Sequence, residues 1–67
     1  MFQTTLENRM LSLAWEFRKS QNPDNVRFKF QDWVDEDNIN FVYHHVVEEN
    51  RSHDEFLHIL RQQKKVA

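Results

Sequence analysis

The apolar positions near the start of the chain recur with the period of an α-helix. Between residues 5 and 20 they are spaced i, i+4, i+7, i+8 and i+11, which places them along one helical face. The segment Thr4–Glu7 has the pattern of a capping box, in which a hydroxyl and a carboxylate satisfy backbone N–H groups. The sequence therefore predicts a first helix over residues 5–20. Its apolar stripe consists of Leu6, Met10, Leu13, Ala14 and Phe17.

A polar break follows this helix, and a proline makes it the clearest interruption in the chain. The residue before a proline avoids the helical region, so Asn22 either ends the first helix or caps the next one. In the second case Pro23 occupies the first helical position, where a backbone N–H is not needed. Both interpretations place a boundary between two elements here.

The segment after this break fits two patterns. Val26, Phe28 and Phe30 alternate as the residues of a half-buried strand do. A single short strand would have no neighbour to pair with, and the same segment also has helical spacing. We favour a helix over 26–34 whose start is partly extended. The helical set is Val26, Phe30, Trp33 and Val34.

Two further helices are predicted in the second half of the chain. An acidic turn over residues 35–38 precedes the third helix, which spans about residues 38–49. The segment Ser52–Glu55 has the pattern of a second capping box, which predicts that the last helix begins there. The third helix has the apolar stripe Ile39, Val42, Tyr43, Val46 and Val47, and the last helix has Phe56, Ile59 and Leu60.

Composition narrows the fold class. The chain has no glycine, so the Asn-Gly and Asp-Gly turns that favour tight β-hairpins are absent. It also has no cysteine, which excludes disulfides and thiolate metal sites. A chain this short buries only about 60% of the surface of its unfolded form, so its core is marginal. We predict one all-α domain over residues 1–67, with three or four short helices in a compact orthogonal bundle.

Four large apolar residues fall outside the predicted stripes. On a helical wheel, Leu11 and Trp15 lie nearly opposite the stripe of the first helix, and Phe28 and Phe41 lie opposite those of the next two. Isolated exposed apolar residues are common, and a helix in a compact bundle can bury two faces. Alternatively, the four residues form an apolar surface that contacts a partner, because large aromatic side chains are the usual anchors of protein interfaces.

The net charge of −2 conceals an uneven distribution. Residues 32–55 carry eight acidic side chains and one basic, a charge of −7, and the segments on either side are net positive. Such a run is typical of a solvated face and of helix starts. It would also steer a basic partner, such as a nucleic-acid-binding protein. The candidate acidic contacts are Asp32, Asp35, Glu36, Asp37, Glu48 and Glu49.

Three histidines lie four residues from a carboxylate, which places each pair on one helical face. Each pair supplies half of a metal site, but surface ion pairs are the simpler interpretation, and we expect neither a metal nor a cofactor. The sequence contains no nucleophile elbow or glycine-rich phosphate loop, so we do not expect an enzyme. The pairs are His44–Glu48, His45–Glu49 and Asp54–His58.

Together these features favour a non-catalytic regulatory module that binds and modulates a protein partner and that we expect to form a homodimer. The composition is typical of accessory proteins of phages or mobile elements. We expect no membrane span and a cytoplasmic location, in the host cytoplasm if the protein is viral, because no apolar run approaches about 20 residues. A small helix-turn-helix DNA-binding regulator is the alternative. Direct nucleic-acid binding is disfavoured because residues 38–49 contain no lysine or arginine for phosphate contacts.

Overall fold

Helices form most of residues 5–63, the part of the chain that the computed structural model describes, and they coincide with the segments of apolar periodicity. The fold is all-α, as predicted, and these residues contain no strand. None of the described helices has the length and hydropathy needed to cross a bilayer. The helices are α1 (Leu6–Lys19), α2 (Pro23–Phe30), α3 (Glu36–Val42) and α4 (His53–Gln63), and α3 continues directly into a π-helical segment, η1 (Tyr43–Glu48).

Hydroxyl groups begin the first and last helices, which confirms one half of each predicted capping box. The carboxylates of Glu7 and Glu55 instead contact Arg61 and Arg51. At α1, the hydroxyl of Thr5 accepts a hydrogen bond from the backbone N–H of Asn8 at 3.1 Å. At α4, the hydroxyl of Ser52 accepts one from the N–H of Glu55 at 3.2 Å. Each bond satisfies an N–H group that has no partner within the helix. Thr4, the other threonine of the predicted first box, lies outside the described residues.

The polar break after α1 caps the next helix. The side-chain oxygen of Asn22 accepts from the backbone N–H of Asn25 at 3.4 Å, and Pro23 is the first residue of α2. Because α2 begins at Pro23, both Val26 and Phe28 lie within the helix. The helix that we favoured for this segment is therefore present, but it begins earlier than predicted, has no extended start and ends at Phe30, so Trp33 and Val34 lie in the turn that follows it.

The end of the third helix differs from a regular α-helix. The N–H of Glu49 donates a hydrogen bond to the carbonyl of His44 at 2.9 Å, and the N–H of Arg51 donates one to the carbonyl of His45 at 3.0 Å. These bonds span five and six residues, whereas those of an α-helix span four. Between these two donors, Asn50 has a φ of 53°, in the left-handed region that asparagine tolerates better than most residues. A left-handed residue is a common way to end a helix, and here it turns the chain toward α4.

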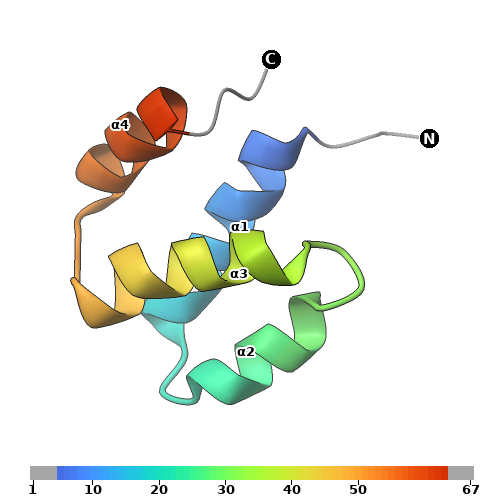
Figure 1. Cartoon of the computed structure of the whole chain (residues 1–67). Coiled ribbons are helices and arrows are strands. Elements are labelled where there is room, and N and C mark those ends of the chain that lie inside the picture. Colours follow the sequence, from blue (N-terminus) through green and yellow to red (C-terminus); the bar gives the residue numbers. More distant parts are fainter. Residues whose placement is uncertain (1–4, 64–67) are drawn as a thin grey trace.

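One continuous helix, formed by α3 and η1, crosses α1, with α2 below it and α4 above it in the view of Figure 1. It begins at Glu36, slightly before the predicted start. Arg27 of α2 donates a hydrogen bond to the side-chain oxygen of Asn40 at 2.6 Å, and its guanidinium lies 5.4 Å from the ring centre of Tyr43. These contacts hold α2 against the α3–η1 helix.

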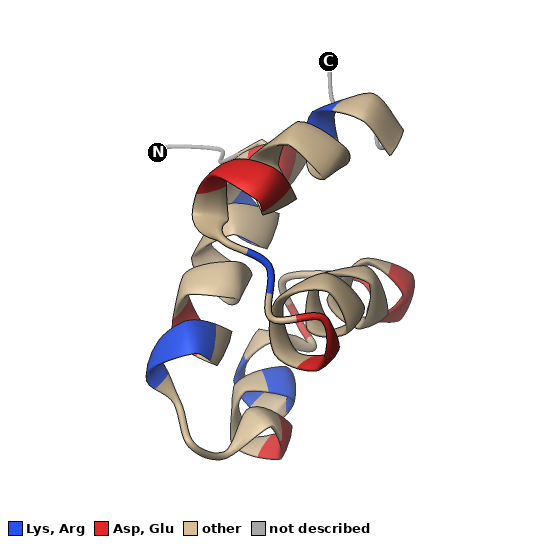
Figure 2. Ribbon diagram, turned by 90° about the vertical axis from the view of Figure 1, so that its left-hand side faces the viewer, with Lys and Arg blue, Asp and Glu red and all other residues tan. Residues whose placement is uncertain are grey.

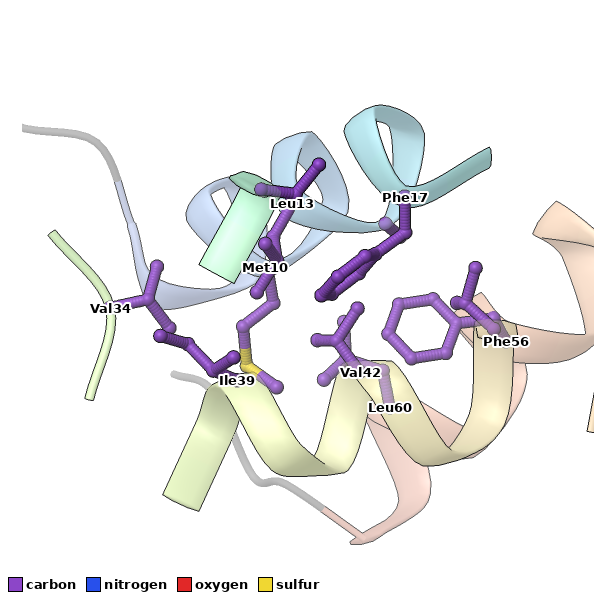
Figure 3. Packing of buried hydrophobic residues seen from close by; sticks show 11 residues of the cluster. Met10, Leu13, Phe17, Val34, Ile39, Val42, Phe56 and Leu60 are labelled. Carbon is purple, nitrogen blue, oxygen red and sulfur yellow. The ribbon is translucent and has the colours of Figure 1, made fainter. Parts of the chain in front are cut away.

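The core lies where the helices cross. Side chains from α1, from the α3–η1 helix and from α4 meet there (Figure 3). Because α4 contributes Phe56 and Leu60, both fully buried, it is held to the rest of the molecule mainly by apolar contact. The largest fully buried side chains are Met10, Leu13, Val42, Phe56 and Leu60.

Candidate functional site

Leu11 and Trp15 lie together at a hollow on the surface between α1 and α2. Trp15 is 58% exposed, whereas Leu11 is partly buried and packs against the core. Phe30 of α2 lines the same hollow, which has a volume of about 400 Å³. The structure therefore brings two of the four predicted apolar contacts into one place. The rest of the lining is polar and consists of Asn8, Ser12 and Glu16.

Trp33 extends this surface, although its helical spacing led us to expect it in the core. It is 39% exposed, and its ring centre lies 5.6 Å from that of Phe30. The guanidinium of Arg9 lies 5.5 Å from the ring centre of Trp33 and donates a hydrogen bond to its carbonyl at 3.2 Å. We define the apolar surface as Leu11, Trp15, Phe30 and Trp33.

Phe28 is 70% exposed, but it does not belong to the apolar surface. It lines a different hollow, of about 450 Å³, where α2 faces the start of α3. Ile39 and Glu36 of α3 line the same hollow. Phe28 and Trp15 are therefore exposed at separate hollows, and one partner residue cannot occupy both.

Phe41 is partly buried because α4 covers it. Its ring centre lies 4.6 Å from that of His45 and 6.1 Å from that of Phe56 in α4. The helical wheel correctly separated Phe41 from the stripe that faces α1, but it could not show that a later helix packs on that side. Phe41 thus packs against the core in this structure.

The acidic side chains of residues 32–55 do not form one continuous patch. Those before and at the start of α3 lie at one end of the α3–η1 helix, and Glu48 and Glu49 lie at the other end (Figure 2). At a rise of 1.5 Å per residue, Glu36 and Glu48 are separated by roughly 18 Å along the helix. The first group consists of Asp32, Asp35, Glu36 and Asp37.

The histidines form one of the predicted pairs and one unexpected contact. The Nδ1 atom of His44 lies 3.0 Å from a carboxylate oxygen of Glu48, as its spacing predicts. His45 instead accepts a hydrogen bond at Nδ1 from the Nε–H of Arg51, at 3.2 Å. Burial lowers the pKa of His45 below its ordinary value, and the charges of His44 and Arg51 lower it further.

Nothing within residues 5–63 assembles a metal centre. No group of three or more histidine, aspartate or glutamate side chains in this part of the chain is arranged to hold a metal ion. Arg51, which donates to His45, also lies 3.6 Å from a carboxylate oxygen of Glu49 and 3.4 Å from one of Glu55. The His44–Glu48 half-site has no third metal ligand among the described residues, and Nδ1 of His45 accepts a hydrogen bond from Arg51.

Comparison of the chain with known proteins gives no relative from which a function could be transferred. No protein-family model, no curated protein and no solved structure matches it. A function must therefore be inferred from the geometry of the chain's own residues.

Proposed function

We propose that the protein is a non-catalytic module that binds a protein through its apolar surface. The observation that carries this proposal is the exposure of 58% of Trp15 beside a hollow lined by Leu11 and Phe30. Burying a tryptophan in an interface removes a large apolar area from water and immobilises few torsions. Such residues account for much of the binding free energy at protein interfaces.

The occupant we propose for this surface is a second copy of the chain. The surface carries a hollow with the exposed side chain of Trp15 in its wall, so a two-fold axis can bring Trp15 of each copy against the hollow of the other. Charges of both signs lie there too, since Lys19 is 3.4 Å from Glu16 and 5.9 Å from the ring centre of Trp15. An isologous interface requires a surface that complements itself, and a hollow flanked by charges of both signs supports that arrangement.

The other functional expectations have less support. A basic partner for the acidic side chains stays a prediction, and the separation of the two acidic groups means that it would need two contact points. Residues 36–48, which would be the recognition helix of a helix-turn-helix protein, contain acidic residues and no lysine or arginine. Phosphates would be repelled by this helix. Regulation of a further protein by the dimer also stays a prediction.

The test is the mass of the purified protein in solution, measured by sedimentation or light scattering over a range of concentrations. We expect the wild-type chain to pass from monomer to dimer as its concentration rises. Trp15→Ala should weaken the dimer roughly 30-fold or more, as expected for an anchor residue. Phe28→Ala is the matched control, because Phe28 is even more exposed and lies at the other hollow.

Circular dichroism of each variant separates loss of association from loss of fold. A Trp15→Ala protein that remains helical and becomes monomeric supports the proposal. A wild-type chain that is monomeric at every concentration contradicts the proposed occupant. If Trp15→Ala and Phe28→Ala weaken the dimer equally, the apolar surface is not the interface.

A further inference from the structure

Arg51 is the centre of the corner that joins η1 to α4. Its Nε–H donates to Nδ1 of His45 at 3.2 Å, and its backbone N–H donates to the carbonyl of the same residue at 3.0 Å. Its terminal nitrogens lie 3.6 Å from Glu49 and 3.4 Å from Glu55. Its carbonyl accepts a hydrogen bond from Arg18 of α1 at 3.3 Å. One residue thus connects η1, α4 and α1.

The bond between Arg51 and His45 fixes the protonation of the imidazole. A guanidinium stays charged at every accessible pH and can only donate hydrogen bonds. Nδ1 of His45 must therefore carry a free lone pair, and the ring hydrogen must be on Nε2. A second proton on the ring would occupy Nδ1 and turn this hydrogen bond into a contact between two cations.

The groups that surround His45 divide into those that oppose its protonation and those that favour it. His44 on the same helix and Arg51 in the corner oppose it, and so does burial of the ring against Phe41 and Phe56. Glu49, four residues along the chain, favours it. The charged groups of α4 and α1 influence the protonation of His45 indirectly, because they contact Arg51. Glu55 of α4 pairs with its guanidinium, and Arg18 of α1 donates to its carbonyl.

We propose that the corner between η1 and α4 is a proton-operated latch. With His45 neutral, the latch is closed and Arg51 holds the start of α4 beside η1. Protonation of His45 removes the acceptor, and the imidazolium turns to Glu49, the carboxylate at helical i+4 spacing. Arg51 then loses both its bond to His45 and part of its contact with Glu49. The corner opens, and α4 loses a polar connection to the rest of the molecule.

Phe56 transmits this change into the core. Its ring is fully buried, and its centre lies 6.4 Å from that of His45 and 6.1 Å from that of Phe41. A charged imidazole draws water toward these rings, because an ion in apolar surroundings is costly without a partner. Opening of the corner therefore makes the whole of α4 detach more often from the core.

Amide hydrogen exchange of the full chain tests the latch directly. Protection of the α4 amides, corrected for the intrinsic effect of pH, should fall roughly threefold to tenfold when one stabilising hydrogen bond is lost. The measurement compares about pH 7.5 with about pH 5.5. With the corner open, His45 regains its ordinary pKa and binds a proton between these values, whereas with the corner closed its pKa is lowered. His45→Gln keeps an acceptor oxygen that does not titrate in this range, so its α4 protection should change little.

His53→Gln is the control, because it removes a histidine from the first turn of α4 without changing His45 or its bond to Arg51. This variant should keep the pH response of the wild-type chain. If His45→Gln keeps it as well, or if His53→Gln removes it, the latch is wrong.

Should His45→Gln fail to fold, ¹⁵N NMR of the wild-type imidazole decides instead. A hydrogen on Nδ1 at neutral pH would contradict the proposal. The proposal is supported if the ring hydrogen is on Nε2 at neutral pH and if, as the pH is lowered, a second hydrogen appears on Nδ1 while the Arg51 Nε–H signal shifts.

Discussion

Arg61 in α4 reaches back to Glu7 in the first turn of α1, with 3.1 Å between its guanidinium nitrogen and the carboxylate oxygen. The two residues are 54 positions apart in the chain. Their contact therefore ties the far end of α4 to the start of α1. The contacts of Arg51 hold the other end of α4. The apolar contacts of Phe56 and Leu60 therefore lie between two polar contacts, one at each end of the helix.

We predict that breaking this ion pair has a small effect on stability. Arg61→Ala should lower the free energy of unfolding by about 0.2–1 kcal/mol, because 61% of the Arg61 side chain is exposed and water screens the pair. Chemical denaturation measures this loss. The exchanged pair Glu7→Arg with Arg61→Glu should recover less than the whole loss, because it places a cation in the first turn of α1 and an anion in the last turn of α4. A loss several times larger would mean that Arg61 also holds α4 by packing.

Truncation of the buried aromatic ring of α4 should be far more damaging. Phe56 is completely shielded from water, and removing such a ring costs about 3–5 kcal/mol. For a domain this small, that is a large part of the total stability. We expect Phe56→Ala to be mostly unfolded by circular dichroism at room temperature and Phe56→Leu to remain folded. A well-folded Phe56→Ala protein would show that α4 does not depend on the core.

The left-handed residue after η1 gives a prediction about backbone conformation. Asn50→Gly should leave the free energy of unfolding within a few tenths of a kcal/mol, because glycine reaches a φ of 53° without steric cost. Asn50→Val should lower it by about 1–2 kcal/mol, since a β-branched residue in this region is strained. Thermal unfolding of the two variants gives the comparison. Equal melting temperatures for both would place Asn50 outside the left-handed region.

Stability should also depend on pH through His45. Its pKa is lowered in the folded protein, mainly by burial, whereas the unfolded chain has the ordinary value of about 6.5. Between these two values, the unfolded state binds a proton that the folded state does not. The free energy of unfolding therefore falls as the pH decreases through this window. Above the unfolded value both states are neutral and the contribution of His45 is fully present; below the folded value its loss is complete.

Urea denaturation at a series of pH values measures this contribution as a difference between proteins. The wild-type chain should lose more stability across the window than His45→Gln does. All other titratable groups are common to the two proteins, so their effect cancels in the comparison. Identical pH profiles would show that His45 titrates in the same way in the folded and unfolded states.

The helices could be predicted because each leaves a local signal in the sequence. The stripe from Met10 to Phe17 and the caps at Thr5 and Ser52 depend on residues close in the chain. The second segment was ambiguous only because alternation and helical spacing coincide over so few residues. The cap at Asn22, which precedes the segment, decides between them.

The apolar surface could be predicted only in part, because exposure depends on which helix arrives next to which face. Leu11 and Phe41 lie off the main stripes of their helices, yet both pack against the core, and Phe41 does so because α4 covers it. Trp33 lies on the helical stripe but remains partly exposed beyond the end of α2. No local pattern marks the π-helical end of the third helix or the contact between His45 and Arg51, which closes only when the corner is formed.

The two ends of the α3–η1 helix differ in how well they tolerate carboxylates. The aligned peptide dipoles give a helix partial positive charge at its first turn and partial negative charge at its last. Glu36 and Asp37 are therefore favourably placed, whereas Glu48 and Glu49 lie at the repulsive end. Arg51 supplies the nearby positive charge that offsets this repulsion. Any event that draws its guanidinium away should unwind the helix from η1 backward, while the dipole keeps the first turns of α3 intact.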